Sequence, residues 1–218
     1  MKIAVLGTGM VGRAVAVGLA RLGHDVVVGS RDPSEAPAKL NLLDAFVGSA
    51  DHGQVSVGSY AEASSGADLV VNALHGRGAI AGIWAAAIAD DTVLLDVANP
   101  LDFTGELPTL FVANDDSLGE QIQREFPSLR VVKSLNTMTA EAMVDPTLVN
   151  GGDFTTFVSG NDDAAKAQVI SLLVALGHQD VIDVGDITTA RGTEAMMLAW
   201  IRLMGPIESP YFTWKVAR

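Results

Sequence analysis

The sequence contains no cysteine, which excludes disulfides, thiolate catalysis and thiolate metal ligands. Its four histidines are scattered and form no pair with metal-binding spacing, so we expect no metal site. Basic residues are also scarce: 14 lysines and arginines stand against 26 aspartates and glutamates, giving a formal net charge of −12. A protein that binds nucleic acid needs a basic face, so we expect no nucleic-acid partner.

Long apolar runs are missing as well. The opening run ends at Gly7, which makes it too short for a membrane span, and it has no signal-peptide cleavage region. We therefore expect a cytoplasmic protein with no membrane partner. The 218 residues suffice for one large domain, or for one domain with a small appendage.

A glycine-rich motif follows the first apolar run and opens a helical pattern. The spacing G-x-G-x-x-G is weak evidence alone, but in this place it predicts a pyrophosphate site, with an ordinary glycine-rich turn as the alternative. The three glycines would permit a tight turn, a close approach of the phosphate and close packing of helix on strand. The helix N-terminus adds amide donors and partial positive charge. The expected cofactor-binding residues of this motif are Gly7, Thr8, Gly9, Met10, Val11 and Gly12.

The end of the second apolar run indicates which dinucleotide binds. An NAD site usually has an acidic residue here for the ribose 2′-hydroxyl, whereas this run ends in Ser30 and Arg31. A hydroxyl and a guanidinium suit a 2′-phosphate, and Thr8 can donate a further hydrogen bond. Asp32 would favour NAD if it turned inward, but before Pro33 we interpret it as a turn residue. The sequence therefore predicts NADP(H).

Short apolar runs alternate with helical patterns along the rest of the chain. We expect strands at 2–6, 25–28, 55–57, 68–74, 92–97, 130–135, 154–158 and 181–184, and helices at 10–22, 38–46, 60–63, 80–89, 116–126, 139–143, 162–176 and 188–204. Near-continuous apolar strands are typical of parallel sheets that are covered on both faces. The pattern predicts an α/β fold of the Rossmann type, with a doubly wound, mostly parallel sheet and a small C-terminal helical lobe.

Three further loops follow strands at the carboxyl edge of that sheet, where such folds bind ligands. We expect the first two to contact the cofactor, through Leu74 and His75 and through Ala98, Asn99 and Pro100. We expect the third to contact the substrate through Asn136, Thr137 and Met138. The alternative interpretations are a simple turn for Asn99-Pro100 and helix caps for Asn136-Thr137.

No residue is a certain catalytic acid or base. His75 is the candidate, because an imidazole titrates near neutrality, but a contact with the cofactor is the favoured interpretation. Hydride transfer between two rings mainly needs alignment and exclusion of water. In the last helix, Arg191 and Glu194 are three residues apart and are expected to form a surface ion pair. His178, which follows a glycine at a helix end, is expected on the surface.

Taken together, the motifs resemble one family. The segments 7–12, 28–31, 96–100, 133–138 and 185–191 are similar to the NADP oxidoreductases that use coenzyme F420, and the similarity covers nearly the whole chain. It implies an NADP-binding Rossmann domain at 1–150 and a small C-terminal α/β lobe at 151–218 that lines the substrate pocket and contacts a partner in a homodimer. It also implies direct hydride transfer between nicotinamide C4 and deazaflavin C5.

The acceptor is less certain than the cofactor. The F420 enzymes carry a histidine at the position of Asn136, and the loop at His75 differs as well. A related domain of membrane ferric reductases passes electrons from NADPH to a flavin, so the fold does not fix the acceptor. F420, a flavin, or a small carbonyl or imine substrate remain open. The rival hypothesis is an NADP(H)-binding redox sensor without turnover.

Overall fold

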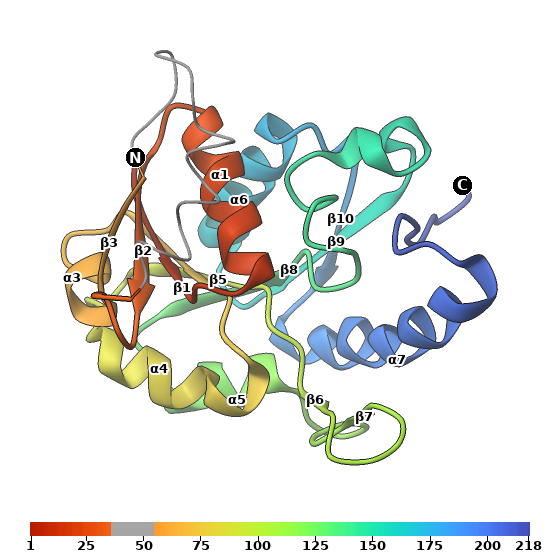
Figure 1. The fold of residues 1–218 in the computed structure, drawn as a ribbon, viewed down its shortest axis with the longest axis horizontal. Coiled ribbons are helices and arrows are strands. Elements are labelled where there is room, and N and C mark those ends of the chain that lie inside the picture. Colours follow the sequence, from red (N-terminus) through yellow and green to blue (C-terminus); the bar gives the residue numbers. More distant parts are fainter. Residues whose placement is uncertain (36–54) are drawn as a thin grey trace.

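The computed structural model describes residues 1–35 and 55–218 (Figure 1). The helix expected at 38–46 lies outside the described residues. The strands are β1 (Lys2–Leu6), β2 (Asp25–Ser30), β3 (Val55–Ser59), β4 (Leu69–Asn72), β5 (Val93–Asp96), β6 (Leu101–Asp102), β7 (Thr109–Leu110), β8 (Arg130–Ser134), β9 (Thr155–Gly160) and β10 (Asp180–Gly185). The helices are α1 (Met10–Arg21), α3 (Tyr60–Ser64), α4 (Ala79–Ala86), α5 (Leu118–Glu125), α6 (Asp163–Ala175) and α7 (Ala190–Ile207).

One eight-stranded sheet forms the centre of the molecule, in the order β10-β9-β8-β5-β4-β1-β2-β3. Every neighbouring pair is parallel except β8 and β9. After β1 the chain adds β2 and β3 on one side of that strand, and it then returns to add β4 on the opposite side of β1. The doubly wound, mostly parallel fold is confirmed, and the order of the strands reverses between β1 and β4.

Helices cover both faces of the sheet because its strands are apolar on both sides. Alternate residues of β1 enter two different cores: Ile3 and Val5 pack with α1 and α6, whereas Ala4 and Leu6 pack with α3, α4 and α5. All four side chains are fully buried. Burial on both faces explains why these strands appear in the sequence as continuous apolar runs.

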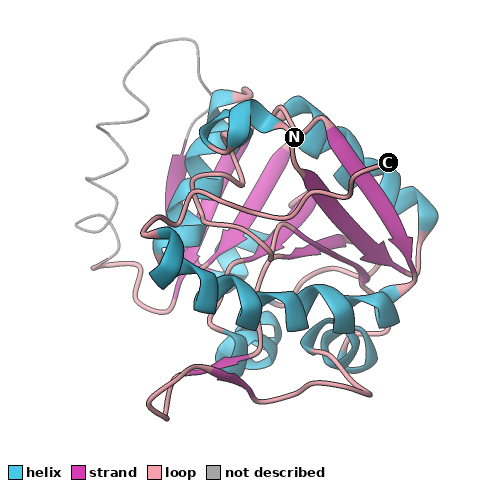
Figure 2. Ribbon diagram, turned by 90° about the vertical axis from the view of Figure 1, so that its right-hand side faces the viewer, coloured by secondary structure: helices cyan, strands magenta, loops and turns pink. Residues whose placement is uncertain are grey.

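The C-terminal part of the chain continues the same sheet. Strand β9 pairs antiparallel with β8, and β10 extends the sheet beyond β9. The expected boundary at residue 150 thus falls between two strands of one sheet, and α7 with the residues after it lies along the side of that sheet (Figure 2). Within the described residues, no helix is both long and apolar enough to cross a membrane.

Two local predictions differ from the structure. The segment 139–143 forms turns rather than the expected helix. A short hairpin, β6–β7, follows β5 where no strand was expected, and it stands out from the body of the molecule (Figures 1 and 2). Its strands contain two residues each, which is too short for an alternating pattern to be visible in the sequence.

Candidate functional site

The glycine motif forms the loop between β1 and α1. Gly7 has φ +119°, a conformation that favours glycine, and its N–H donates to Gly29 O at 3.0 Å. A Cβ on Gly12 would lie 2.0 Å from Gly7 O, so only glycine lets the helix start this close to the strand. A Cβ on Gly9, in contrast, would meet nothing within 4 Å. The loop therefore packs tightly against the protein and is open on its outer side at Gly9.

The N-terminus of α1 faces this open side without a side-chain cap. Gly9 is the N-cap residue and has no side-chain oxygen for the N–H groups of the first turn, which begins at Met10. The first N–H groups of a helix have no partners inside the helix. Together with the helix dipole, these donors form a cradle suited to a phosphate group.

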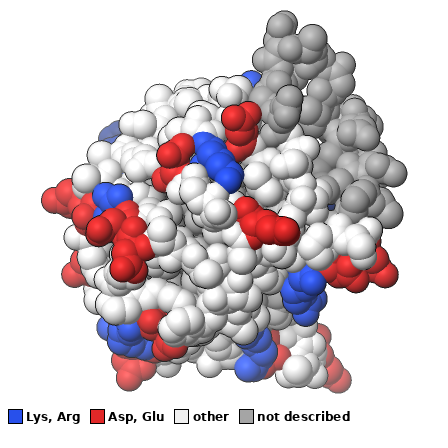
Figure 3. All heavy atoms as spheres, turned by 90° about the vertical axis from the view of Figure 1, so that its left-hand side faces the viewer, with Lys and Arg blue, Asp and Glu red and all other residues white. Residues whose placement is uncertain are grey.

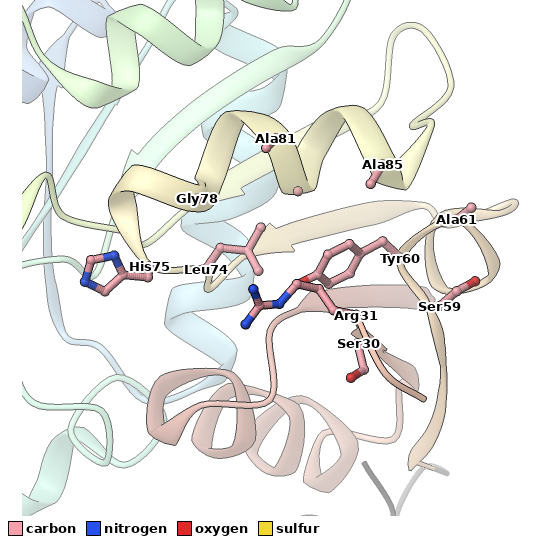
Figure 4. A pocket seen from close by; sticks show the side chains of 11 residues that line it. Ser30, Arg31, Ser59, Tyr60, Ala61, Leu74, His75, Gly78, Ala81 and Ala85 are labelled. Atoms are coloured by element: carbon pink, nitrogen blue, oxygen red, sulfur yellow. The ribbon is translucent and has the colours of Figure 1, made fainter. Parts of the chain in front are cut away.

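A pocket of about 500 Å³ lies at the ends of β2, β3 and β4 (Figure 4). Small residues of α4 form one wall, and the Arg31 guanidinium reaches into the space between the Leu74 and Tyr60 side chains. The combination of a cation, an aromatic ring and a wall of small residues suits a flat aromatic group that carries an anion. The lining residues are Ser30, Arg31, Ser59, Tyr60, Ala61, Leu74, His75, Gly78, Ala81, Gly82 and Ala85.

Arg31 and its two neighbours have different roles. Within the part of the chain that the structure describes, no hydrogen bond or ion pair occupies the Arg31 guanidinium. The Ser30 hydroxyl donates to Asp32 O at 3.0 Å and accepts from Asp32 N at 3.1 Å, so it braces the backbone of the turn. The Asp32 carboxylate accepts from Ser34 N and Ser34 Oγ, at 3.2 and 2.7 Å. Asp32 is therefore a turn residue, as expected, and Arg31 is the charged group of the pocket.

Tyr60 is a pocket residue that the sequence analysis missed. It is the first residue of α3, whose N-terminus is fixed by a capping box: Glu62 N donates to Ser59 Oγ at 3.3 Å, and Ser59 N donates to Glu62 Oε2 at 2.7 Å. Burial raises the pKa of the Tyr60 phenol, and the nearby Arg31 charge opposes that shift. The S-x-x-E spacing at 59–62, directly after a strand, was the signal that could have placed Tyr60 at this edge.

The loops after β4 and β5 lie beside each other on the other side of the glycine motif. A Cβ on Gly76 would lie 2.2 Å from Asn99 O, so the two backbones are in contact. Leu74 and His75 line the pocket, and their contact with the cofactor stays a prediction. The His75 ring lies 6.2 Å from the Phe103 ring of the β6–β7 hairpin, and no described residue forms a hydrogen bond with it. A catalytic role for His75 stays a prediction.

The expected substrate loop is buried and is locked to the β5 loop. Asn136, Thr137 and Met138 are 2%, 2% and 3% exposed. Asn99 Nδ2 donates to Asn136 O at 2.8 Å, and Asn136 Nδ2 donates to Asn99 Oδ1 at 2.9 Å. Thr213 Oγ1, from the segment after α7, donates to Thr137 O at 3.0 Å. The two asparagines, which were expected to face two different ligands, bind each other, and no helix follows for Asn136 and Thr137 to cap.

The expected surface ion pair in α7 is wrong. Arg191 Nε donates to Glu120 Oε2 at 2.8 Å, and the Glu194 carboxylate is buried at 2.8 Å from Lys133 Nζ. The backbone amides of Leu118 and Gly119, at the start of α5, also donate to Glu194. Because α7 packs on the N-terminus of α5, both charged side chains face that helix and β8 instead of each other. Spacing within one helix could not reveal partners more than 60 residues away.

His178 is also buried, contrary to the sequence analysis. Its side chain is 3% exposed and lies against Phe154 in an edge-to-face arrangement. Nε2 lies 3.0 Å from Met143 O and must donate to that carbonyl, so Nδ1 accepts from Thr156 Oγ1 at 2.8 Å. Burial lowers the pKa of the imidazole, with the Met143 carbonyl opposing the shift. His178 thus holds the turn after β8 against β9 as a neutral side chain.

The face that carries β3, α3 and α4 is mixed in charge. Figure 3 shows single basic and acidic side chains interspersed among uncharged ones over its described part. Several basic groups of the described chain are paired, for example Arg124 of α5 with Asp116 at 2.8 Å, and this contact holds the pKa of that carboxyl at about 2. Arg31 is the one arginine that lines the pocket, and no described residue forms a hydrogen bond or ion pair with its guanidinium.

Comparison with known proteins agrees with this geometry. The family model described as NADP oxidoreductase, coenzyme F420-dependent, matches residues 2–100. The solved structure of a candidate F420-dependent NADP reductase from Arthrobacter sp. FB24 is 52% identical, with a TM-score of 0.93 and complete coverage of both chains. The F420-dependent NADP reductase of Methanothermobacter marburgensis is 28% identical over 84% of this chain and 76% of its own.

A second curated relative is much longer than this chain. Metalloreductase STEAP3 of Rattus norvegicus is 26% identical over 90% of the chain, which spans only 36% of that relative's length. The close match to the Arthrobacter protein, in contrast, leaves no part of either chain uncovered. On this evidence, the chain belongs to the family of coenzyme F420-dependent NADP oxidoreductases.

Proposed function

We propose that the protein transfers a hydride between NADPH and a deazaflavin of the F420 type, or a flavin-like acceptor. The observation that carries the proposal is the Arg31 guanidinium, which has no partner among residues 1–35 and 55–218 and lines a pocket beside an uncapped helix N-terminus. An uncapped helix start binds a pyrophosphate, and a free guanidinium at the end of β2 suits the additional 2′-phosphate that distinguishes NADPH from NADH.

The residues around Gly9 and Arg31 suit the pyrophosphate and the adenosine half of this cofactor. The open side at Gly9 leaves room for the pyrophosphate, and the Tyr60 ring and the small residues of α4 leave a flat space for adenine. In sheets of this type the cofactor crosses the point where the strand order reverses, here between β1 and β4. Adenosine bound at Arg31 therefore directs the nicotinamide toward the loops after β4 and β5, at His75 and at 98–100.

The chemistry belongs mainly to the two rings. When bound, NADPH would supply a hydride from nicotinamide C4 to the acceptor ring, whose reduction would be completed by a proton from the solvent once the site opens. The protein has to align the rings and exclude water, which needs no acid or base. A site without a paired catalytic histidine is consistent with this task.

F420 is the favoured acceptor because the relatives support it. The family model and the Methanothermobacter reductase both have F420 in their descriptions. Asn136 is compatible with this acceptor as a structural residue, because its side chain is held by Asn99 within the protein. A flavin remains the second candidate, because flavins also exchange hydride with nicotinamide cofactors.

We also propose that the protein works as a cytoplasmic homodimer. The C-terminal half of α7 exposes apolar side chains in the single chain: Leu203 is 38%, Met204 36% and Ile207 45% exposed. A row of apolar residues on one helix is costly in water and is covered at low cost by a second copy of the same surface.

A rapid-mixing assay tests the proposed reaction. NADPH oxidation is followed with F420 and, in parallel, with flavin mononucleotide, and NADPH binding is measured separately by titration. We expect fast reduction of F420 with NADPH preferred over NADH. Tight NADPH binding with neither acceptor reduced would contradict the proposed reaction while leaving the cofactor site intact.

A further inference from the structure

Four buried polar side chains from different elements form one continuous network beneath the proposed nicotinamide site. Asn72 (β4), Asp96 (β5), Lys133 (β8) and Glu194 (α7) are each at most 2% exposed, and we call them the Lys133 network. Asn72 Nδ2 donates to Asp96 Oδ1 at 2.8 Å. Lys133 Nζ lies 2.8 Å from both Asp96 Oδ2 and Glu194 Oε1. The network thus crosses three neighbouring strands and ends on the C-terminal helix.

Lys133 is charged in this setting. Burial by itself lowers the pKa of its ammonium, but the Asp96 and Glu194 carboxylates outweigh burial and the net shift is upward. Glu194 is further balanced by the N-terminus of α5, where Leu118 N and Gly119 N donate to it at 2.8 and 3.0 Å. Buried ion pairs rarely stabilise a fold more than apolar packing of the same volume. A gain in fold stability therefore does not explain why these buried positions carry charged side chains.

The network holds the backbone of Ala98 from both sides. Lys133 Nζ donates to Ala98 O at 2.5 Å, and Ala98 N donates to Asp96 Oδ1 at 3.1 Å. The next residue, Asn99, is the one that locks onto the 136–138 loop. On the other side, Asn72 Oδ1 accepts from Leu74 N at 3.3 Å. Both loops that the proposed function places next to the nicotinamide are thus anchored in the same four side chains.

We propose that Lys133 is a positioning residue for hydride transfer, which fixes the 98–100 backbone against the nicotinamide and ties that backbone to α7 through Glu194. The proposal rests on the proposed function, because it needs the nicotinamide at this edge of the sheet. Transfer rates depend steeply on geometry, and a displacement of about 1 Å can lower a rate about a hundredfold. A charged anchor inside the fold restricts such displacements more than a methyl contact would.

Two variants separate positioning from stability. Lys133→Met leaves two carboxylates buried without their partner and is expected to lower the melting temperature strongly. The double variant Lys133→Met/Glu194→Gln removes one positive and one negative charge, so the net charge of the network is unchanged and part of the melting temperature should return. The matched control is Arg191→Gln, which removes another ion pair between α5 and α7, to Glu120, without touching Ala98.

Three quantities are measured on each folded variant: the NADPH dissociation constant, the fluorescence of the bound nicotinamide, and the rate of NADPH oxidation by F420. For both Lys133 variants we expect a rate about 10- to 100-fold lower and nicotinamide fluorescence closer to that of free NADPH. The dissociation constant should change less than about threefold, because the Arg31 pocket lies apart from the network. The control should match the wild type in all three.

The decisive comparison is the double variant. Recovery of the melting temperature without recovery of the rate and the fluorescence supports positioning. A wild-type rate and wild-type fluorescence in the single variant would overturn the proposal. A double variant in which rate, fluorescence and melting temperature all return to wild-type values would overturn it as well. If the wild type binds NADPH but reduces no acceptor, the proposed function fails, and the fluorescence of bound NADPH still decides whether Lys133 positions the nicotinamide.

Discussion

Replacing Arg31 by alanine should weaken NADPH binding far more than NADH binding. The Arg31 guanidinium has no hydrogen-bond or ion-pair partner within the described residues, so its removal leaves none of those residues unpaired. The expected loss is the contact with the 2′-phosphate alone. For a charge-assisted contact at an exposed side chain this amounts to about 1–3 kcal/mol, which corresponds to about a 5- to 150-fold increase in the NADPH dissociation constant.

NADH provides the internal reference because it lacks the 2′-phosphate. It should lose only the contact between the guanidinium and adenine, about 0.5–1 kcal/mol at an exposed site. Titrations of both cofactors at low and high ionic strength give the ratio of their dissociation constants. The preference of the wild type for NADPH should fall with added salt, and that of Arg31→Ala should not, because a charge-charge contact near the surface is screened.

Arg124→Ala is the matched control. This arginine is also exposed, but it lies on α5 in an ion pair with Asp116 and does not line the pocket. Its removal should leave both dissociation constants unchanged. Equal losses for NADPH and NADH in Arg31→Ala would refute the role of Arg31 in selecting the 2′-phosphate.

Three further predictions concern the fold and the assembly. Gly9→Ala should keep the wild-type melting temperature but lose NADPH affinity, because the added Cβ enters the space left for the pyrophosphate. Gly12→Ala should unfold at a lower temperature, because its Cβ meets Gly7 O. Calorimetry with and without NADPH distinguishes the two variants. Burial lowers the pKa of His178 below its unfolded value, so the unfolded chain binds more protons and the free energy of unfolding should fall as the pH drops through about 6.5. Urea titrations at several pH values should show a shallower fall in His178→Gln. The same dependence of the unfolding free energy on pH in both proteins would contradict this. Light scattering should give a dimer that Ile207→Glu weakens, and a wild-type species of 22.7 kDa at micromolar concentration would reject it.

The sequence was most informative where structure is encoded locally. The glycine motif and the apolar strands are contiguous patterns, and each predicts its own conformation without knowledge of the rest of the chain. Arg31 directly follows a strand, so the rule that ligands bind at carboxyl edges was enough to place it at the same edge of the sheet as the glycine motif. These residues indicated both the fold and the choice of NADP(H).

The errors concern side chains whose partners are distant in the sequence. Glu194 lies in an apolar helix, and neither spacing nor composition shows that Lys133 and the start of α5 will meet it. His178 looked like an ordinary turn residue because its partners, Thr156 and Met143, lie 22 and 35 residues away. Tyr60 lies in the pocket because β3, which it follows, pairs with β2, and the sequence does not show that pairing. Tertiary packing decides such cases, and a single sequence does not show it.

The contact between Thr213 and the 136–138 loop has a consequence for synthesis. The glycine motif, Arg31 and Tyr60 all lie in the first third of the chain, whereas Thr213 is five residues from the end of the sequence. Thr155, at the start of β9, likewise receives its backbone partner from Trp214. On the ribosome, the nucleotide half can therefore assemble from early segments, while the loop next to the proposed acceptor gains this anchor only once Thr213, which lies 76 residues after Thr137, has been made.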